Sequence, residues 1–253
     1  GTPAQFVDGQ WWYDEGKRQL LYRTGSDEKI DDRHIELTRQ PSLLSVRDAD
    51  WIEYRDLDFG FSGKTAVTVR GSANVTLRRI GISDAGQNGI SVSEGARVAI
   101  EACQRQRVGN NGIVFNGSGL RPLTDSSIRN CEITNVARND CITLHKNSIG
   151  QEVGPGHLLA GNVLAECAEQ GIDITSGRDV VVRGNKTERN GVSGIVIGHG
   201  VHSITIEGHL SKDDGNDANI IIGNSYDVSL VSSCILGNAR HQLVVRDARH
   251  VRV

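Results

Sequence analysis

The chain has 253 residues, including 30 Gly, 4 Pro and no Met, and its formal net charge is −3. This charge balance provides no basic surface for a run of phosphates, so we expect no nucleic-acid partner. No apolar run approaches the roughly 20 residues of a membrane span, so we also expect no membrane partner. The Gly-rich, Pro-poor composition favours an all-β chain with tight turns. Without an initiator Met the sequence fits a processed chain, which favours a secreted or periplasmic protein.

The first predicted element is a β-hairpin within residues 1–41. The apolar runs WWY at 11–13 and LLY at 20–22 flank a turn through Asp14 to Gly16. Apolar runs on either side of such a turn are typical of a hairpin. The residues after this hairpin repeat at a fixed period, which predicts a solenoid, and the terminal coils of a solenoid expose an apolar cross-section and unpaired strands. We therefore expect residues 1–41 to form a hairpin that caps or flanks a separate domain, residues 42–253.

Residues 42–253 repeat one apolar-x-apolar tetrad at spacings of 23 to 30 residues. One residue from each tetrad forms the series Leu44, Val67, Ile90, Ile113, Ile142, Ile172, Ile195, Ile220 and Leu243. A second apolar series lies between these positions, at Tyr54, Leu77, Ile100, Ile128, Leu159, Val182, Ile206, Leu230 and Val253. A fixed period with two apolar series predicts stacked coils with at least two strands each. The expected fold is a parallel β-helix of about nine coils.

A third column follows the second series by three residues and contains stacked Cys and Asn. It includes Cys103, Cys131, Asn162, Asn185 and His209. Identical residues on adjacent strands about 4.8 Å apart can hydrogen-bond along the stack, so we expect an interior ladder. The other cysteines are Cys141, Cys167 and Cys234, and an odd number without CxxC spacing matches neither a disulfide framework nor a zinc site. We expect all five to fill the core.

The coil period, the outward alternation of polar residues and the opening GQWWYDEGKRQLLYRT resemble the pectin-lyase-like superfamily of right-handed parallel β-helix proteins. This resemblance covers nearly the whole chain. It implies a polysaccharide-active protein with a substrate groove along one parallel sheet, such as a lyase, a glycoside hydrolase, a sugar epimerase or a phage tailspike. The hairpin is similar to a segment that precedes the β-helix in several bacterial glycoside hydrolases.

Two insertions mark the expected site. The first and second apolar series are usually 10 or 11 residues apart, but 15 and 17 residues separate them after Ile113 and Ile142. Both insertions therefore fall in the same turn of adjacent coils, at about 116–126 and 146–156. Long loops on a rigid scaffold commonly carry function, so we expect them to wall a groove.

The residues beside these loops suggest acid–base chemistry on a poly- or oligosaccharide. The expected catalytic residues are Asp173, His145, Asp140 and Glu169, and the expected substrate-binding residues are Lys146, Thr143, Thr175, Arg178 and His199. A glycoside hydrolase needs two carboxylates across the scissile bond, and the groove edge is richer in carboxylates than in cations. A hydrolase is therefore slightly favoured, with His145 orienting a carboxylate.

Two alternatives stay open at this point. A uronate lyase or epimerase would use His145 as the base and cations to stabilise the enolate-like charge. A non-catalytic carbohydrate-binding or adhesive β-helix would need no titrating pair. We expect no metal or cofactor: Asp213, Asp214 and Asp217 match a calcium loop in composition but lack its DxDxDG order, which favours a solvated acidic turn. The last coil ends without an evident cap, so a contact partner or further sequence is expected there.

Overall fold

The computed structural model describes residues 11–14, 17, 19–22, 40–117, 121–146, 152–215, 217–237 and 240–253. The chain divides into two units, Gly1–Leu37 and Thr38–Val253, a few residues before the expected boundary. In the first unit β1 (Trp11–Asp14) pairs antiparallel with β2 (Gln19–Tyr22), which confirms the hairpin. Its role as a cap stays a prediction.

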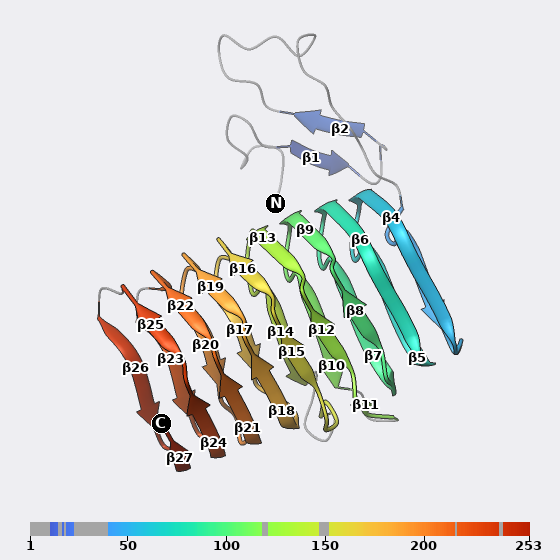
Figure 1. Cartoon of the computed structure of the whole chain (residues 1–253). Helices are drawn as coiled ribbons and strands as arrows, with labels where there is room; N and C mark the ends of the chain where they lie inside the picture. The colour runs from blue at the N-terminus through green and yellow to red at the C-terminus, as the bar shows by residue number, and fades with distance from the viewer. Residues whose placement is uncertain are drawn as a thin grey trace. The chain divides into compact units, whose positions relative to one another are not determined.

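The second unit is a parallel β-solenoid, and its first sheet contains one short strand from each coil (Figure 1). The strands of this sheet are β3 (Leu44–Arg47), β5 (Val67–Ala73), β7 (Ile90–Ala96), β10 (Ile113–Gly117), β14 (Ile142–Lys146), β17 (Gln170–Ile174), β20 (Ser193–Ile197), β23 (Ala218–Gly223) and β26 (His241–Arg246). The short β11 (Leu123–Thr124) pairs beside them with the end of β7.

The second sheet bends to form the two other faces of the coils. In the first two coils single long strands, β4 (Ile52–Ser62) and β6 (Val75–Ala85), cross both faces. Later coils begin this sheet with β8 (Ala99–Glu101), β12 (Ser127–Arg129), β15 (Leu158–Ala160), β18 (Arg178–Arg183), β21 (His202–Glu207), β24 (Tyr226–Val231) and β27 (Arg249–Arg252). They complete it with β9 (Gln104–Val108), β13 (Glu132–Val136), β16 (Val163–Ala165), β19 (Lys186–Glu188), β22 (Leu210–Lys212) and β25 (Cys234–Leu236). Among the described residues no helix is long and apolar enough to cross a membrane.

The strand register confirms the predicted repeat. The nine members of the first apolar series pair with one another from coil to coil, from Leu44 opposite Val67 to Ile220 opposite Leu243. Alternate residues of these strands are buried, so the stacked Val and Ile side chains form one continuous core. Because each strand has neighbours on both sides, outward side chains stand in straight columns about 4.8 Å apart.

The corner between the two halves of the second sheet contains the predicted polar ladder. The Asn185 carboxamide oxygen accepts hydrogen bonds of 2.9 Å from both the backbone N–H and the side chain of Asn162. The Asn162 oxygen in turn accepts one from the Cys131 N–H, at 2.9 Å. These bonds satisfy amides that would otherwise be unpaired in the core, so Asn can occupy an interior column.

A buried arginine lies in the core, between two apolar residues of its register column. Arg105 in β9 is only 1% exposed, and its register neighbours are Ile82 and Ile133. None of its three guanidinium nitrogens hydrogen-bonds to a described residue. Leaving a buried polar group unpaired costs about 1–3 kcal/mol.

We therefore expect Arg105→Ile to raise the free energy of unfolding by about 1–3 kcal/mol, measured by urea denaturation. Arg107→Ile is the matched control, because Arg107 is exposed and ion-paired with Asp84 at 2.8 Å. Equal stability of the Arg105 variant and the wild type would show that the guanidinium is solvated or paired in solution.

Candidate functional site

Both insertions occupy the turn that leads from the first sheet into the second, as predicted. They separate β10 from β12 and β14 from β15. Their described parts lie side by side: the Gly154 N–H donates to the Leu123 carbonyl at 2.8 Å, and the Asp125 N–H donates to the Pro155 carbonyl at 2.9 Å. The buried His157 bonds to residues at the end of the first loop. Its Nδ1 accepts a hydrogen bond from the Ser126 N–H, and its Nε2 bonds to the Leu123 carbonyl oxygen.

A cluster of carboxyl groups lies on β14 and β17 of the first sheet, with two of its members at the amino ends of these strands, whereas the inserted loops follow the carboxyl ends of β10 and β14. Asp173 in β17 pairs in register with Thr143 in β14, and its Oδ2 accepts hydrogen bonds of 3.3 Å from the hydroxyls of Thr143 and Thr175. Asp140 precedes β14 and is 6% exposed, with its Oδ1 accepting from the Gln170 N–H at 3.0 Å. Glu169, just before β17, is exposed.

Burial shifts the protonation of both aspartates. Loss of solvent raises the pKa of Asp140 to about 8, and the negative charges of Asp173 and Glu169 add to this effect. Loss of solvent also raises the pKa of Asp173 to about 6, while the hydrogen bonds from Thr143 and Thr175 oppose the increase. Near neutral pH the cluster therefore holds one protonated carboxyl group and one carboxylate on adjacent coils.

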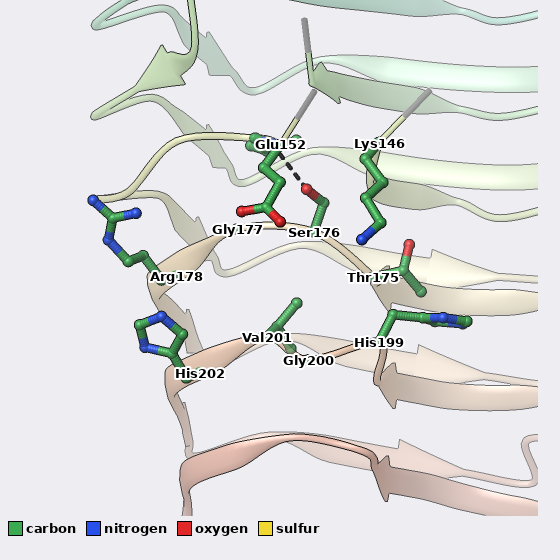
Figure 2. A pocket seen from close by; sticks show the side chains of 11 residues that line it. Lys146, Glu152, Thr175, Ser176, Gly177, Arg178, His199, Gly200, Val201 and His202 are labelled. Atoms are coloured by element: carbon green, nitrogen blue, oxygen red, sulfur yellow. Dashed lines mark hydrogen bonds between the residues drawn. The ribbon is translucent and has the colours of Figure 1, made fainter. Parts of the chain in front are cut away.

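A cleft lies at the carboxyl ends of β14, β17 and β20, with a volume of about 40 Å³ (Figure 2). Lys146, Thr175 and His199 stand along one side, and Arg178 and His202 stand along the other. Glu152 lies between the two sides. The next residue, Val153, anchors this segment, because the Val153 N–H donates a hydrogen bond of 2.9 Å to the Ser176 hydroxyl. Thr175 belongs to both parts of the site, because its hydroxyl also contacts Asp173.

The structure brings together most of the predicted site residues, in two groups. Lys146, Thr175, Arg178 and His199 line the cleft, while Asp140, Glu169 and Asp173 form the carboxyl cluster. Thr143, expected to bind substrate, is 4% exposed and its hydroxyl is bonded to Asp173. His145 is exposed and pairs in register with Asn116. No hydrogen bond joins His145 to Asp173, because Thr143 occupies the position opposite Asp173.

Sequence reasoning missed Glu152, Ser176 and His202. His202 opens a strand of the second sheet, and only its register pairing with Arg178 brings it to the cleft. Glu152 lies in an inserted loop whose path the repeat does not determine. Near β20, the sequence predicted only His199, in the turn that follows this strand, as a residue of the site.

The acidic turn is not wholly solvated, contrary to our expectation. Asp214 is fully buried and accepts hydrogen bonds from the side chains of Thr187, Ser211 and Asn190, at 2.6, 2.7 and 2.8 Å. Its carboxylate therefore stabilises polar groups inside the coil, whereas Asp213 is exposed. Among the described residues no group of three or more His, Cys, Asp and Glu is arranged to hold a metal ion.

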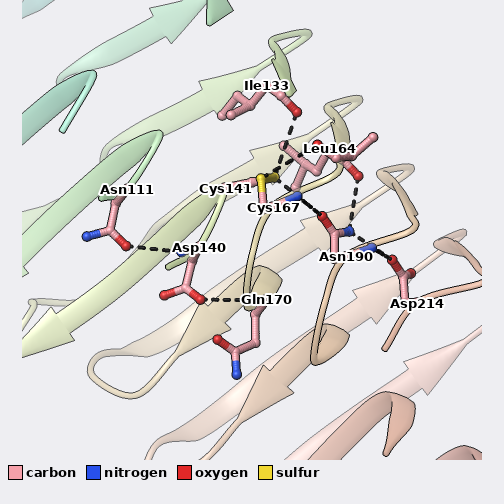
Figure 3. Close-up of a disulfide and its surroundings, with 10 residues drawn as sticks. Asn111, Ile133, Asp140, Cys141, Leu164, Cys167, Gln170, Asn190 and Asp214 are labelled. Carbon is pink, nitrogen blue, oxygen red and sulfur yellow. Dashed lines mark hydrogen bonds between the residues drawn. A yellow bond between two sulfur atoms is a disulfide. The ribbon is translucent and has the colours of Figure 1, made fainter. Parts of the chain in front are cut away.

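The prediction that all five cysteines fill the core is wrong for Cys234, and the sequence did not predict that two of the buried ones are paired. Cys103 and Cys131 are buried thiols, but Cys234 is exposed, and Cys141 and Cys167 form a disulfide (Figure 3). Cys141 follows Asp140, and Cys167 lies three residues before Gln170, so the disulfide joins the two coils that carry the carboxyl cluster. The two cysteines are 26 residues apart, whereas register partners such as Ile142 and Ile172 on these coils are 30 apart, so the coil period does not predict this pair.

Because this disulfide spans 26 residues, we expect Cys141→Ser/Cys167→Ser to lower the free energy of unfolding by about 3 kcal/mol. Denaturant unfolding of the double variant measures the loss. Cys234→Ser serves as the control and should leave stability unchanged, since Cys234 is exposed. A double variant as stable as the wild type would contradict the cross-link.

These features define a class: a parallel β-solenoid with a polar site at one turn of its central coils. The chain belongs to the family described as the right-handed β-helix region, whose sequence model matches residues 22–154. The predicted right-handed parallel β-helix is thereby confirmed. No curated protein was found to match the sequence.

Several solved structures share the fold. A structure described as a glycoside hydrolase gives a TM-score of 0.60 at 16% identity, covering 96% of this chain and 57% of that one. The A-module of the mannuronan C-5 epimerase AlgE6 from Azotobacter vinelandii gives 0.57 at 17% identity, covering 83% and 66%. An alginate lyase from Paenibacillus sp. gives 0.54 at 13% identity, covering 84% and 99%. The chain thus spans less than two thirds of the first two proteins, and identities this low show the fold alone.

Proposed function

We propose that the chain is a carbohydrate-active enzyme that cleaves a poly- or oligosaccharide, and specifically a glycoside hydrolase. The observation that carries this proposal is a pair of aspartates on adjacent coils, the buried Asp140 and the threonine-bonded Asp173. Burial raises the pKa of Asp140 to about 8 and that of Asp173 to about 6. Two carboxyl groups whose environments separate their pKa values in this way are suited to act as acid and base. Near pH 7 one can donate a proton while the other accepts one or attacks.

The roles follow from the surroundings of each carboxyl group. Asp140 is the general acid, because burial and the nearby charges of Asp173 and Glu169 keep it protonated. Asp173 is the base or nucleophile, held in one orientation by Thr143 and Thr175. Glu169 raises the pKa of both and lies exposed at the groove edge. The cleft connects to this pair through Thr175, which bonds Asp173, so a glycan lying along β17 would extend from the cleft toward Asp140 at the amino end of β14.

The comparisons support the enzyme class. A glycoside hydrolase, an epimerase and a lyase that act on glycans all use this fold. A fold accommodates many reactions, so the choice among them rests on the site. The disulfide supports an oxidising compartment, in agreement with the secreted or periplasmic location that we favour.

A uronate lyase or epimerase is the second candidate, and the cations of the cleft favour it. In that reaction His145, exposed at the end of β14, would remove the proton next to the substrate carboxylate, while Lys146 and Arg178 would stabilise the resulting charge. A non-catalytic binding protein would not need the two raised pKa values of the aspartates.

The discriminating experiment is an assay of the purified protein on neutral and uronic-acid polysaccharides. Reducing ends and the ultraviolet absorbance of unsaturated ends are followed together. New reducing ends without absorbance support hydrolysis, whereas both signals rising together would replace it with elimination. No product from a folded protein, with glycan binding retained, would instead favour the non-catalytic class.

A further inference from the structure

Asp140, the proposed general acid, is held by hydrogen bonds to the coils on both sides of it. Its backbone N–H donates to the Asn111 Oδ1 at 3.2 Å, and its backbone carbonyl accepts from the Gly112 N–H at 3.0 Å. On the opposite side its carboxyl Oδ1 accepts from the Gln170 N–H at 3.0 Å (Figure 3). The carboxyl group therefore keeps its place only while the turns around Asp140 and Gln170 stay at a fixed separation.

The Cys141–Cys167 disulfide joins these two turns covalently. Cys141 directly follows Asp140, and Cys167 lies three residues before Gln170. The Cα atoms of the two cysteines are 5.7 Å apart, and both side chains are buried. Next to this bond the Cys141 N–H donates to the Gln170 carbonyl at 2.9 Å. One covalent bond thus limits the movement of the turn that carries the acid against the turn that binds its carboxyl group.

The disulfide is itself anchored to the buried polar network of the following coils. The Cys167 N–H donates to the Asn190 Oδ1 at 3.0 Å, and the Asn190 side-chain amide donates to the Asp214 Oδ1 at 2.8 Å (Figure 3). Asn190 is 2% exposed and Asp214 is fully buried. A buried network of this kind is a rigid support, because leaving any of its groups unpaired is costly. The Cys167 turn is therefore a fixed point to which the Asp140 turn is tied.

The repeat itself does not require a cross-link at this place. All five cysteines of the chain lie in the described residues, and only this pair forms a disulfide. The other neighbouring coils stack without a covalent bond between them. The bond occurs where adjacent coils also carry Asp140, Glu169 and Asp173.

Loosening these turns would change the protonation of Asp140 in a defined direction. Burial is the largest cause of its raised pKa, and the negative charges of Asp173 and Glu169 act in the same direction. The hydrogen bond from the Gln170 N–H opposes the increase but contributes less than burial does. Once the turns separate, water reaches the carboxyl group, and its pKa falls toward the ordinary value of 3.8 even though the opposing bond is also lost.

We infer that the Cys141–Cys167 disulfide is a positioning element of the site: it holds the Asp140 carboxyl group buried between its neighbouring turns, in the place from which it acts as the acid. The effect on Asp140 follows from the contacts alone, whereas the effect on cleavage rests on the proposed function. Positioning is separate from the general stability that the bond provides, because that stability depends mainly on the unfolded chain.

An NMR titration of the Asp140 carboxyl carbon tests the positioning without any substrate. The spectrum of Asp140→Asn identifies the signal, and the wild type is then compared with Cys141→Ser/Cys167→Ser. We expect the ionisation constant of Asp140 to increase at least about tenfold in the double variant. Should this variant fail to fold, Cys141→Val/Cys167→Ala removes the cross-link while retaining apolar volume in the core. An unchanged ionisation constant in a folded variant would overturn the inference.

Two controls separate positioning from loss of stability. Leu77→Ala removes a fully buried side chain in β6 and should destabilise the fold without changing the ionisation of Asp140. Cys234→Ser removes the exposed thiol and should change neither stability nor ionisation. A change of equal size in Leu77→Ala would mean that any destabilisation releases Asp140, and it would overturn the specific role of the disulfide.

Activity then distinguishes this inference from the proposed function. When both hold, kcat/KM of the double variant near pH 7 falls by about 10- to 100-fold, and the alkaline limb of its pH profile moves to lower pH. Altered ionisation of Asp140 with unchanged cleavage would support the positioning and overturn Asp140 as the acid. Unaltered ionisation with normal cleavage would overturn the positioning and leave the hydrolase standing.

Discussion

Replacing Asp173 with Asn is expected to lower kcat for glycan cleavage by about 10²- to 10⁴-fold, the usual contribution of a general acid or base. Asp140→Asn should cause a loss of similar size on substrates with poor leaving groups. Asp58→Asn is the control, because Asp58 is an exposed aspartate in β4, on the second sheet. Full activity of either site variant would contradict the proposed acid–base pair.

The pH profile gives the same prediction a second readout. Activity in kcat/KM should rise as Asp173 loses its proton, through about pH 6, and fall as Asp140 loses its proton, through about pH 8. The expected bell-shaped curve has its maximum near pH 7. Because the two groups interact, the limbs report the pair as a whole. Residual activity of Asp140→Asn should lack the alkaline limb, which a purely structural defect would not remove selectively.

Asp140→Asn is also expected to stabilise the fold near neutral pH, by up to about 4 kcal/mol. The folded-state pKa of Asp140, about 8, is well above its ordinary value of 3.8. The unfolded chain therefore ionises first, and the stability that the protonated carboxyl group contributes is lost as pH rises from about 4 to about 8. Asn cannot ionise and so avoids this loss.

Urea unfolding of the wild type and the variant at about pH 4 and about pH 7 measures this effect. The stability gain should be small at the lower pH and large at the higher one. A gain independent of pH would mean that Asn packs better rather than that it removes a buried titrating group. A variant that gains stability while losing activity would match the usual cost of holding a carboxyl group ready for catalysis.

Much of the fold could be predicted from the sequence because every coil of a solenoid repeats the same pattern of core-facing residues. Each coil contacts only its neighbours, so the residues that face the core recur at the coil period. The column from Leu44 to Leu243 and the Asn162–Asn185 ladder therefore appear as spacings before any coordinates are known. The same regularity makes insertions visible, so the turn that carries the site was also predictable.

The contacts within the site were harder to predict from the sequence. The sequence predicted that His145 orients a carboxylate, but the hydrogen-bond partners of Asp173 are the hydroxyls of Thr143 and Thr175. The Cys141–Cys167 disulfide was not predictable, because its separation of 26 residues differs from the 30 residues between register partners on these coils. The repeat also gave no reason to expect a buried arginine at position 105. His202 reaches the cleft only through the pairing of β18 with β21.

The sequence by itself thus determined the coil period, the inward and outward faces of each strand and the turn with long loops, because these depend on local periodicity. Only the tertiary structure decided which carboxyl group is buried, which is hydrogen-bonded and which side chains line the cleft. The physical reason is that a pKa depends on desolvation and on charges from neighbouring coils. Both are set by how the coils stack and by the path of the inserted loops, which no single repeat encodes.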